Sequence, residues 1–247
     1  MDRSLYIAMS GAKQTLYAQT TNANNLANSQ TTGFKSDLEQ MRSMPVFGEG
    51  YPTRVYAMTE RPGVDFTPGA IQTTGGDLDV AIKGDGFFAV QAADGKEAYT
   101  RAGDLKLTPE GLLQTGTGLP VMGQGGPISI PPAQKMSIGS DGTISIVPLG
   151  GNANATVVVD QIKMVKADRQ NVEKLTDGLF HVKDQGQPLA ADPNVNLIQG
   201  ALEGSNVNAL QAMVDMIELA KNFELQTKVM KNANDNSGAS AKLMQMA

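Results

Sequence analysis

Residues 4–28 read SLYIAMSGAKQTLYAQTTNANNLAN, and their apolar side chains recur at intervals of three and four positions. This spacing places them on one face of an α-helix, with Gln19 as the one polar interruption. The turn formers that follow Asn28 are expected to end this helix. The apolar stripe comprises Leu5, Ala8, Ala12, Leu16, Ala23 and Leu26.

A second apolar stripe with the same spacing lies near the other end of the chain. Asn206 or Asn208 can cap this second helix, and Gln211 lies three residues after Asn208, in capping-box position. We expect the helix to begin near Ser205 and to continue to about Ala233, after which asparagines and Gly238 should fray it. The stripe comprises Leu210, Met213, Val214, Ile217, Ala220 and Phe223.

Amphipathic helices most often pack on their own domain, which is the simpler interpretation of both stripes. Three features favour assembly between subunits instead. The helices lie at opposite ends of the chain. Their faces are rich in Ala and Met, which suit close helix–helix packing. A helix of 25 residues is about 38 Å long, which is long relative to one compact domain. We therefore expect the helices to pair as a coiled-coil-like domain, mobile in a free subunit and ordered on assembly.

The region between the helices has the pattern of short strands and turns. Asp94-Gly95 separates the apolar runs 87–92 and 97–101, which is a hairpin signal. Several such strands predict a mostly antiparallel β domain at 79–203, either a sandwich or a partly open barrel. The fold class is therefore predicted to be α+β.

Two helical segments and an extended segment complete the predicted organisation. The helical domain is expected to comprise residues 1–35 and 204–247. Residues 36–78 are expected to form an extended linker or arm, because each proline removes an amide donor and fixes φ. These prolines are Pro45, Pro52, Pro62 and Pro68.

Composition argues against most kinds of chemistry. The net charge is −5 and the 20 basic residues are scattered, so no nucleic-acid surface is expected. There is no Cys, and His181 is the only histidine, so the usual catalytic pairs and metal sites are not expected. Asp77, Asp79 and Asp85 lack the spacing of a calcium loop. We expect no catalytic residue, metal, cofactor or small-molecule substrate.

The N-terminus lacks the apolar segment of a signal peptide, and no stretch approaches the length of a membrane helix. If the protein leaves the cytoplasm, we expect a route without cleavage and no membrane span.

Four motifs occur in the order typical of one protein family. Residues 79–90 and 99–103 are similar to its shared strand–turn–strand and the segment that follows. Residues 205–208 and 213–217 are similar to its closing helix. Its N-terminal signature is matched by Ala23-Asn24-Asn25-Leu26-Ala27-Asn28 and Thr32-Gly33-Phe34-Lys35. The chain thus resembles the bacterial flagellar rod and hook family.

The resemblance implies a structural subunit that assembles through its terminal helices into the drive shaft carrying motor torque. Its partners would be copies of itself, other proximal and distal rod proteins, and the flagellar type III export apparatus. It would lie in the periplasmic rod of the basal body. Residues 223–226 and the compact length resemble proximal rod members. A distal rod or hook-type subunit, or a soluble β-rich binding module, is the alternative.

The resemblance also suggests a hinge after the first helix. Gly33 permits an unusual φ, and Phe34 would anchor the linker against a helix. The motif and hinge residues are Asn24, Asn25, Asn28, Thr32, Gly33, Phe34 and Lys35.

Overall fold

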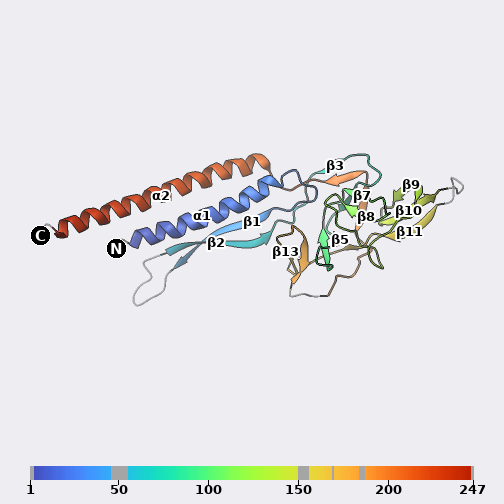
Figure 1. Ribbon diagram of the computed structural model, residues 1–247, viewed down its shortest axis with the longest axis horizontal. Coiled ribbons are helices and arrows are strands. Elements are labelled where there is room, and N and C mark those ends of the chain that lie inside the picture. Colours follow the sequence, from blue (N-terminus) through green and yellow to red (C-terminus); the bar gives the residue numbers. More distant parts are fainter. Residues whose placement is uncertain (1–2, 46–54, 150–155, 169, 184–186, 246–247) are drawn as a thin grey trace. The chain divides into compact units, whose positions relative to one another are not determined.

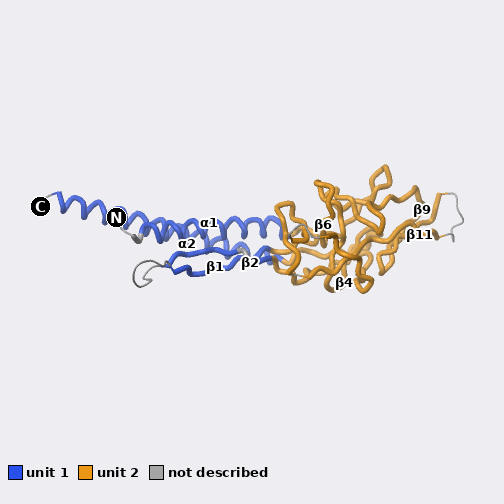
Figure 2. Tube along the Cα trace, turned by 90° about the horizontal axis from the view of Figure 1, so that it is seen from below, with its two compact units in different colours: residues 1–29, 37–63, 207–247 blue, residues 30–36, 64–206 orange. Residues whose placement is uncertain are grey.

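The protein forms two compact units, which the chain enters and leaves more than once. The computed structural model describes residues 3–45, 55–149, 156–168, 170–183 and 187–245. Unit 1 contains residues 1–29, 37–63 and 207–247, and unit 2 contains residues 30–36 and 64–206 (Figure 2). Pro52, one of the four prolines of the expected linker, lies outside the described residues, as do the first two and the last two residues of the chain.

Unit 1 consists of two long helices and a two-stranded sheet. The helices are α1 (Arg3–Ala27) and α2 (Ala209–Gln245), which lie side by side in both views (Figures 1 and 2). The strands are β1 (Asp37–Pro45) and β2 (Val55–Val64), which pair with each other. The segment expected to be a linker, 36–78, is therefore divided, with 37–63 in unit 1 and 64–78 in unit 2.

The second helix is longer than the sequence suggested. We expected fraying after about Ala233, but α2 continues through Asn234, Asn236 and Gly238 to Gln245. A glycine in an exposed helix interior costs only about 1 kcal/mol. Propagation of an existing helix adds one hydrogen bond per residue, and Lys242 in the last turn complements the helix dipole.

Unit 2 contains the remaining strands, in small sheets. A five-stranded sheet has the order β12-β5-β6-β14-β13, and a three-stranded sheet has the order β11-β10-β9. Three further pairs are β15-β4, β16-β3 and β7-β8. Their bounds are β3 (Ile71–Thr73), β4 (Val80–Lys83), β5 (Phe87–Gln91), β6 (Glu97–Thr100), β7 (Leu105–Leu107), β8 (Leu113–Thr115), β9 (Ala133–Ile138), β10 (Thr143–Pro148), β11 (Val157–Gln161), β12 (Met164–Val165), β13 (Val172–Lys174), β14 (Phe180–Val182), β15 (Asn196–Gln199) and β16 (Ala201–Glu203).

The strand pairings of unit 2 are antiparallel. The hairpin predicted around Asp94-Gly95 is confirmed, with Phe88 opposite Thr100 and Gln91 opposite Glu97. The described strands close no barrel. The α+β class is thus confirmed, with a helix near each terminus and mostly antiparallel strands between them in the sequence. The sandwich and the coiled-coil pairing stay predictions.

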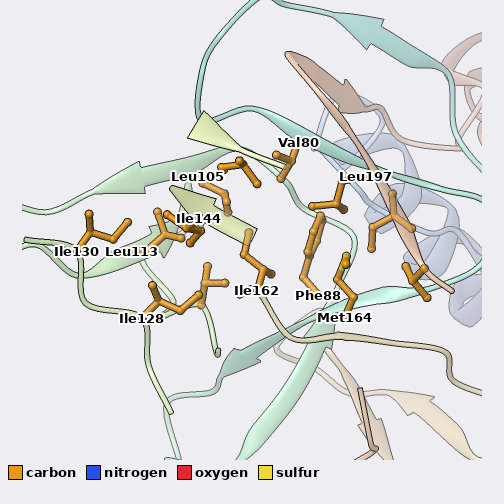
Figure 3. Packing of buried hydrophobic residues seen from close by; sticks show 14 of the residues in the cluster. Val80, Phe88, Leu105, Leu113, Ile128, Ile130, Ile144, Ile162, Met164 and Leu197 are labelled. Atoms are coloured by element: carbon orange, nitrogen blue, oxygen red, sulfur yellow. The ribbon is translucent and has the colours of Figure 1, made fainter. Parts of the chain in front are cut away.

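The core of unit 2 is built from β-branched and aliphatic side chains. Phe88, Leu113 and Ile144 are fully buried and belong to one cluster (Figure 3). A second cluster is aromatic, and the ring centroids of Phe87 and Phe180 lie 5.0 Å apart. Unit 2 therefore has the packed interior of an independently stable domain.

Burial of Tyr99 predicts a loss of stability at high pH. Tyr99 is fully buried, its hydroxyl accepts a hydrogen bond from the Leu189 amide, and burial raises its pKa from 10.0 to about 12. The unfolded chain therefore loses this proton first, and the stabilising effect is present below pH 10. Between pH 10 and 12 the free energy of unfolding should fall by about 1.4 kcal/mol per pH unit.

Urea unfolding at pH 9, 10 and 11 measures this slope, with Tyr99→Phe as the control because it cannot ionise. An equally steep decline in Tyr99→Phe would assign the effect to other groups.

Candidate assembly surface

The two helices of unit 1 pack through small side chains. Asn22 Nδ2 donates to the Ala212 carbonyl at 2.7 Å, and Gln226 Nε2 donates to Thr15 Oγ1 at 3.2 Å. The end of α1 therefore meets the start of α2, and the partner on α2 moves toward its C-terminus as α1 is followed back to Thr15, so the helices are antiparallel. The buried residues on the two helices are Ala8, Ala12, Thr15, Ala18, Ala212 and Ala233.

Gly11 lies where the two helices come close. A Cβ at this position would be 2.8 Å from Gln226 Oε1. Small residues at intervals of three and four let helix backbones approach closely. The buried part of the contact between α1 and α2 is thus made mainly by Ala, Gly and Thr, and Asn22 and Gln226 add hydrogen bonds to it.

Most of the predicted stripe on α2 is exposed rather than packed against α1. Ala212, on the opposite side, is buried, whereas Ala220 is exposed and Phe223 is half-buried. Four of its large members are exposed over about half or more of their surface, with Leu210 at 77%, Met213 at 49%, Val214 at 58% and Ile217 at 71%.

The predicted stripe on α1 divides between two environments. Ala8 and Ala12 are buried in unit 1. Leu5 and Leu16 are exposed, as are Ile7, Met9 and Tyr17 nearby. The other two members, Ala23 and Leu26, are exposed and half-buried, respectively.

The strands of unit 1 are tied to α1 by hydrogen bonds. Ser10 Oγ donates to the Ala57 carbonyl at 3.2 Å, and the Thr59 amide donates to Gln14 Oε1 at 3.1 Å. On the strands, the exposed large side chains are Leu38, Met41, Met44 and Val55. Unit 1 therefore presents apolar side chains from all four of its elements.

Part of the sequence motif lies at the end of α1, within unit 1. Asn25 exchanges two hydrogen bonds with the backbone of Asp37, at 2.9 and 3.0 Å, and so joins the helix to the start of β1. Asn28 Nδ2 donates to the Asn24 carbonyl at 2.9 Å, which satisfies an acceptor in the last turn. These side chains have structural roles in ending the helix.

The rest of the motif, residues 32–35, is fixed inside unit 2. Gly33 has φ +68°, and its amide donates to the Glu203 carbonyl at 2.7 Å. A Cβ there would lie 2.3 Å from the Arg101 carbonyl carbon. Phe34 stacks under Lys174 Nζ, 3.8 Å from the ring centroid. These contacts place Gly33 and Phe34 in a tightly packed segment, and the hinge role stays a prediction.

Lys35 is the centre of a buried ionic cluster in unit 2. Its Nζ donates to Glu203 Oε1 at 2.6 Å and to the Thr67 carbonyl at 2.8 Å. Glu203 Oε2 lies 3.5 Å from Arg101 Nε, and all three side chains are at most 3% exposed. Burial lowers the pKa of Lys35, and Glu203 opposes that shift.

The same region of unit 2 holds the residues that precede α2. Asn206 Oδ1 accepts from the Ser36 amide at 2.8 Å, and Asn206 Nδ2 donates to the Asp65 carbonyl at 2.9 Å. The segment that follows α1 and the segment that precedes α2 are therefore bound to each other.

Sequence reasoning missed several of these residues. Arg101 and Glu203 are far apart in the sequence and have no local pattern that could have paired them. Gly11, Thr15 and Ala18 did carry a signal, because small residues recur at helical spacing beside the larger ones.

No catalytic arrangement is found among the described residues. His181 Nε2 lies 2.9 Å from Asp177 Oδ2, and the described part of the chain contains no group of side chains that could hold a metal ion. None of the helices described is both long and apolar enough to cross a lipid bilayer. The distinctive surface is therefore the apolar one of unit 1.

Comparison with known proteins gives three family matches along the chain. Residues 5–35 match the flagella basal body rod protein family, and residues 81–146 match the D1 domain of the flagellar hook proteins FlgE/F/G. Residues 198–243 match the C-terminal family of the flagellar basal body rod FlgEFG proteins.

Full-length relatives agree with these matches. The flagellar basal-body rod proteins FlgF of Escherichia coli and Salmonella typhimurium are 44% and 43% identical, with all of each chain covered. FlgG of Bacillus subtilis is 32% identical over 95% of this chain and 96% of its own.

Proposed function

This chain belongs to the family of flagellar basal-body rod proteins, and we propose that it joins the rod through the apolar surface of unit 1. It is a structural subunit of the proximal rod and not an enzyme. It assembles with other rod and hook proteins of the flagellum. The proposal concerns which of its surfaces make those contacts.

One observation carries the proposal. Of the 24 large hydrophobic side chains that are exposed among the described residues, 18 belong to unit 1, which is the smaller unit. A concentration of exposed apolar side chains is typical of protein–protein contact regions in soluble proteins. Unit 2, in contrast, buries most of its large apolar side chains in its own core and exposes six of them.

Exposed stripes on both helices support the predicted coiled-coil-like packing between subunits. Leu210, Val214 and Ile217 follow one another at intervals of four and three, which is the spacing of a coiled-coil seam. A heterologous contact that does not close on itself propagates as a helical array. Such an array of helix pairs would form the shaft that transmits torque.

The chain's composition suits the proposed route to the rod. A protein without cysteine can be exported unfolded by the type III apparatus without mispairing of thiols. The terminal helices would then order as they pack against neighbouring subunits, because isolated helices of this length are marginally stable. By this route the subunit would reach the periplasmic part of the flagellum without cleavage of a signal peptide.

The substitution Ile217→Asp tests the proposed surface. Ile217 is 71% exposed in the single chain, so its replacement should change the free energy of unfolding by about 0.5 kcal/mol or less. A carboxylate buried at an apolar contact would cost several kcal/mol, so assembly should fail. We expect loss of swimming and of sedimentation with basal bodies in cells that lack the natural gene copy.

The control is Leu175→Asp, the same kind of change at a 44% exposed side chain of unit 2. It should leave swimming intact. Swimming by Ile217→Asp at the level of the control would show that this face of α2 makes no essential contact.

A further inference from the structure

Unit 1 contains an apolar groove between its helices and its strands. The groove has a volume of about 570 Å³ and receives residues from α1, both strands and α2. Arg42 is the only charged side chain among its described lining residues, and it is paired with Glu60 at 2.7 Å. The main lining residues are Ile7, Gly11, Met41, Val55, Tyr56 and Val229.

Unit 1 also contains a helical segment that no other described part of the chain covers. We call residues 234–245 of α2 the overhang. In both views α2 extends beyond the described start of α1 (Figures 1 and 2). Ala233 is the last buried residue of α2, and every residue of the overhang is exposed, with Leu243 at 70% and Met244 at 76%.

The overhang leaves apolar side chains uncovered. It continues an existing helix, so its backbone is supported by propagation, but Leu243 and Met244 remain exposed. Ser237, Gly238 and Ala239 are small enough to let another surface approach the helix closely. The overhang has one residue of each charge, Asp235 and Lys242, so no net charge opposes its burial.

We propose that the overhang of one copy occupies the groove of a second copy, with Leu243 and Met244 as the buried side chains. This rests on the proposed function, in which unit 1 makes the contacts between subunits. The apolar side chains of the overhang match the apolar lining, and the groove has the size of a ligand-binding cleft. One chain thus supplies both halves of the contact.

The positions of the overhang and the groove predict an assembly that does not close into a ring. Both lie along α2, and Leu243 is 14 positions beyond Val229, which is about 21 Å at the rise of an α-helix. A second copy that lies beside the first and is shifted by about this length along the direction of α2 would receive the overhang and present its own. Contacts of this head-to-tail kind do not close and therefore build a line of subunits.

Cysteine crosslinking between separate chains tests the contact, since the protein has no cysteine of its own. Two full-length variants, Met41→Cys and an epitope-tagged Met244→Cys, are expressed together in cells that lack the natural copy. Basal bodies are isolated and oxidised mildly, and chains are separated without reductant. Because the cysteines are on different chains, a tagged dimer can form only between copies. We expect such a dimer only when both variants are present.

The matched control is Met44→Cys expressed with Met244→Cys. Met41 and Met44 are on the same strand and are both 53% exposed, but only Met41 lines the groove. The dimer yield should be at least about ten-fold lower for Met44→Cys, because a disulfide requires Cα atoms within about 7 Å.

Three other results would contradict different parts of the proposal. Equal yields from the two pairs, or no dimer from assembled subunits, would overturn this contact and leave the proposed function standing. A disulfide between the tagged chain and a different rod protein would show that this other protein, and not a second copy, receives the overhang. Absence of even the unsubstituted chain from basal bodies would reject the proposed function and this contact together.

Discussion

Gly33→Ala is expected to lower the free energy of unfolding of unit 2 by about 3 kcal/mol or more. A left-handed conformation costs an alanine about 1–2 kcal/mol, and Gly33 has φ +68°. In addition, the new Cβ would lie 2.3 Å from the Arg101 carbonyl carbon and 2.4 Å from the Ala102 nitrogen. These are backbone atoms, so relief requires movement of the chain itself. The melting temperature of the purified protein should fall by about 6–12 °C.

Gly118→Ala separates the two contributions to this loss. Gly118 also has a positive φ, +87°, but a Cβ there would meet no atom within 4 Å. This control should therefore lose only the conformational term, about 1–2 kcal/mol. Equal melting temperatures for Gly33→Ala and Gly118→Ala would show that the segment after α1 is loosely held, as a hinge requires.

This expectation differs from the one that the sequence suggests for the same residue. A glycine within a turn-rich segment after a helix is typical of a hinge, because local sequence reveals only the freedom of the backbone. The structure adds a non-local fact, since Gly33 packs against the segment that follows β6. If the chain bends at this end of α1, the unit boundaries point to the peptide links 29–30 and 36–37 instead.

The helices and the central hairpin were predictable because their signals are local. Helical periodicity located α1 to within a residue at each end, and Asp94-Gly95 identified the turn between β5 and β6. The end of α2 was missed because the Asn- and Gly-containing tail has weak helix propensity. Propensity is a small term that propagation of a long helix can outweigh.

The partner of each helix face was not predictable from the same periodicity. A spacing of three and four shows that side chains share a face but not which surface covers them. Ala212 faces α1, whereas Leu210 and Ile217 on α2 remain exposed. The small residues between the large ones make the intramolecular contact, and this leaves the large ones available for other subunits.

Glu203→Gln is expected to destabilise unit 2 by about 3–5 kcal/mol, because it leaves two buried cations without their shared carboxylate. Glu203 Oε1 accepts from Lys35 Nζ at 2.6 Å and from the Gly69 amide at 3.0 Å. Its other oxygen is 3.5 Å from Arg101 Nε. The glutamine keeps the shape of the side chain, but it lacks the charge and places an NH₂ donor near one of the two cations. Urea unfolding at neutral pH measures the loss.

Two comparisons make this result specific to the buried charge. Glu60→Gln removes a carboxylate from the surface pair with Arg42, which is 2.7 Å long but exposed, and should cost about 1 kcal/mol or less. Adding Lys35→Met to Glu203→Gln removes one unpaired cation and should recover at least about 1 kcal/mol. If the double variant is no more stable than Glu203→Gln alone, hydrogen bonding by Glu203, rather than its charge, holds the cluster together.

This cluster binds the segment after α1 to the residue that ends β16, and both lie in unit 2. Its loss should therefore loosen the packing of these two segments within unit 2.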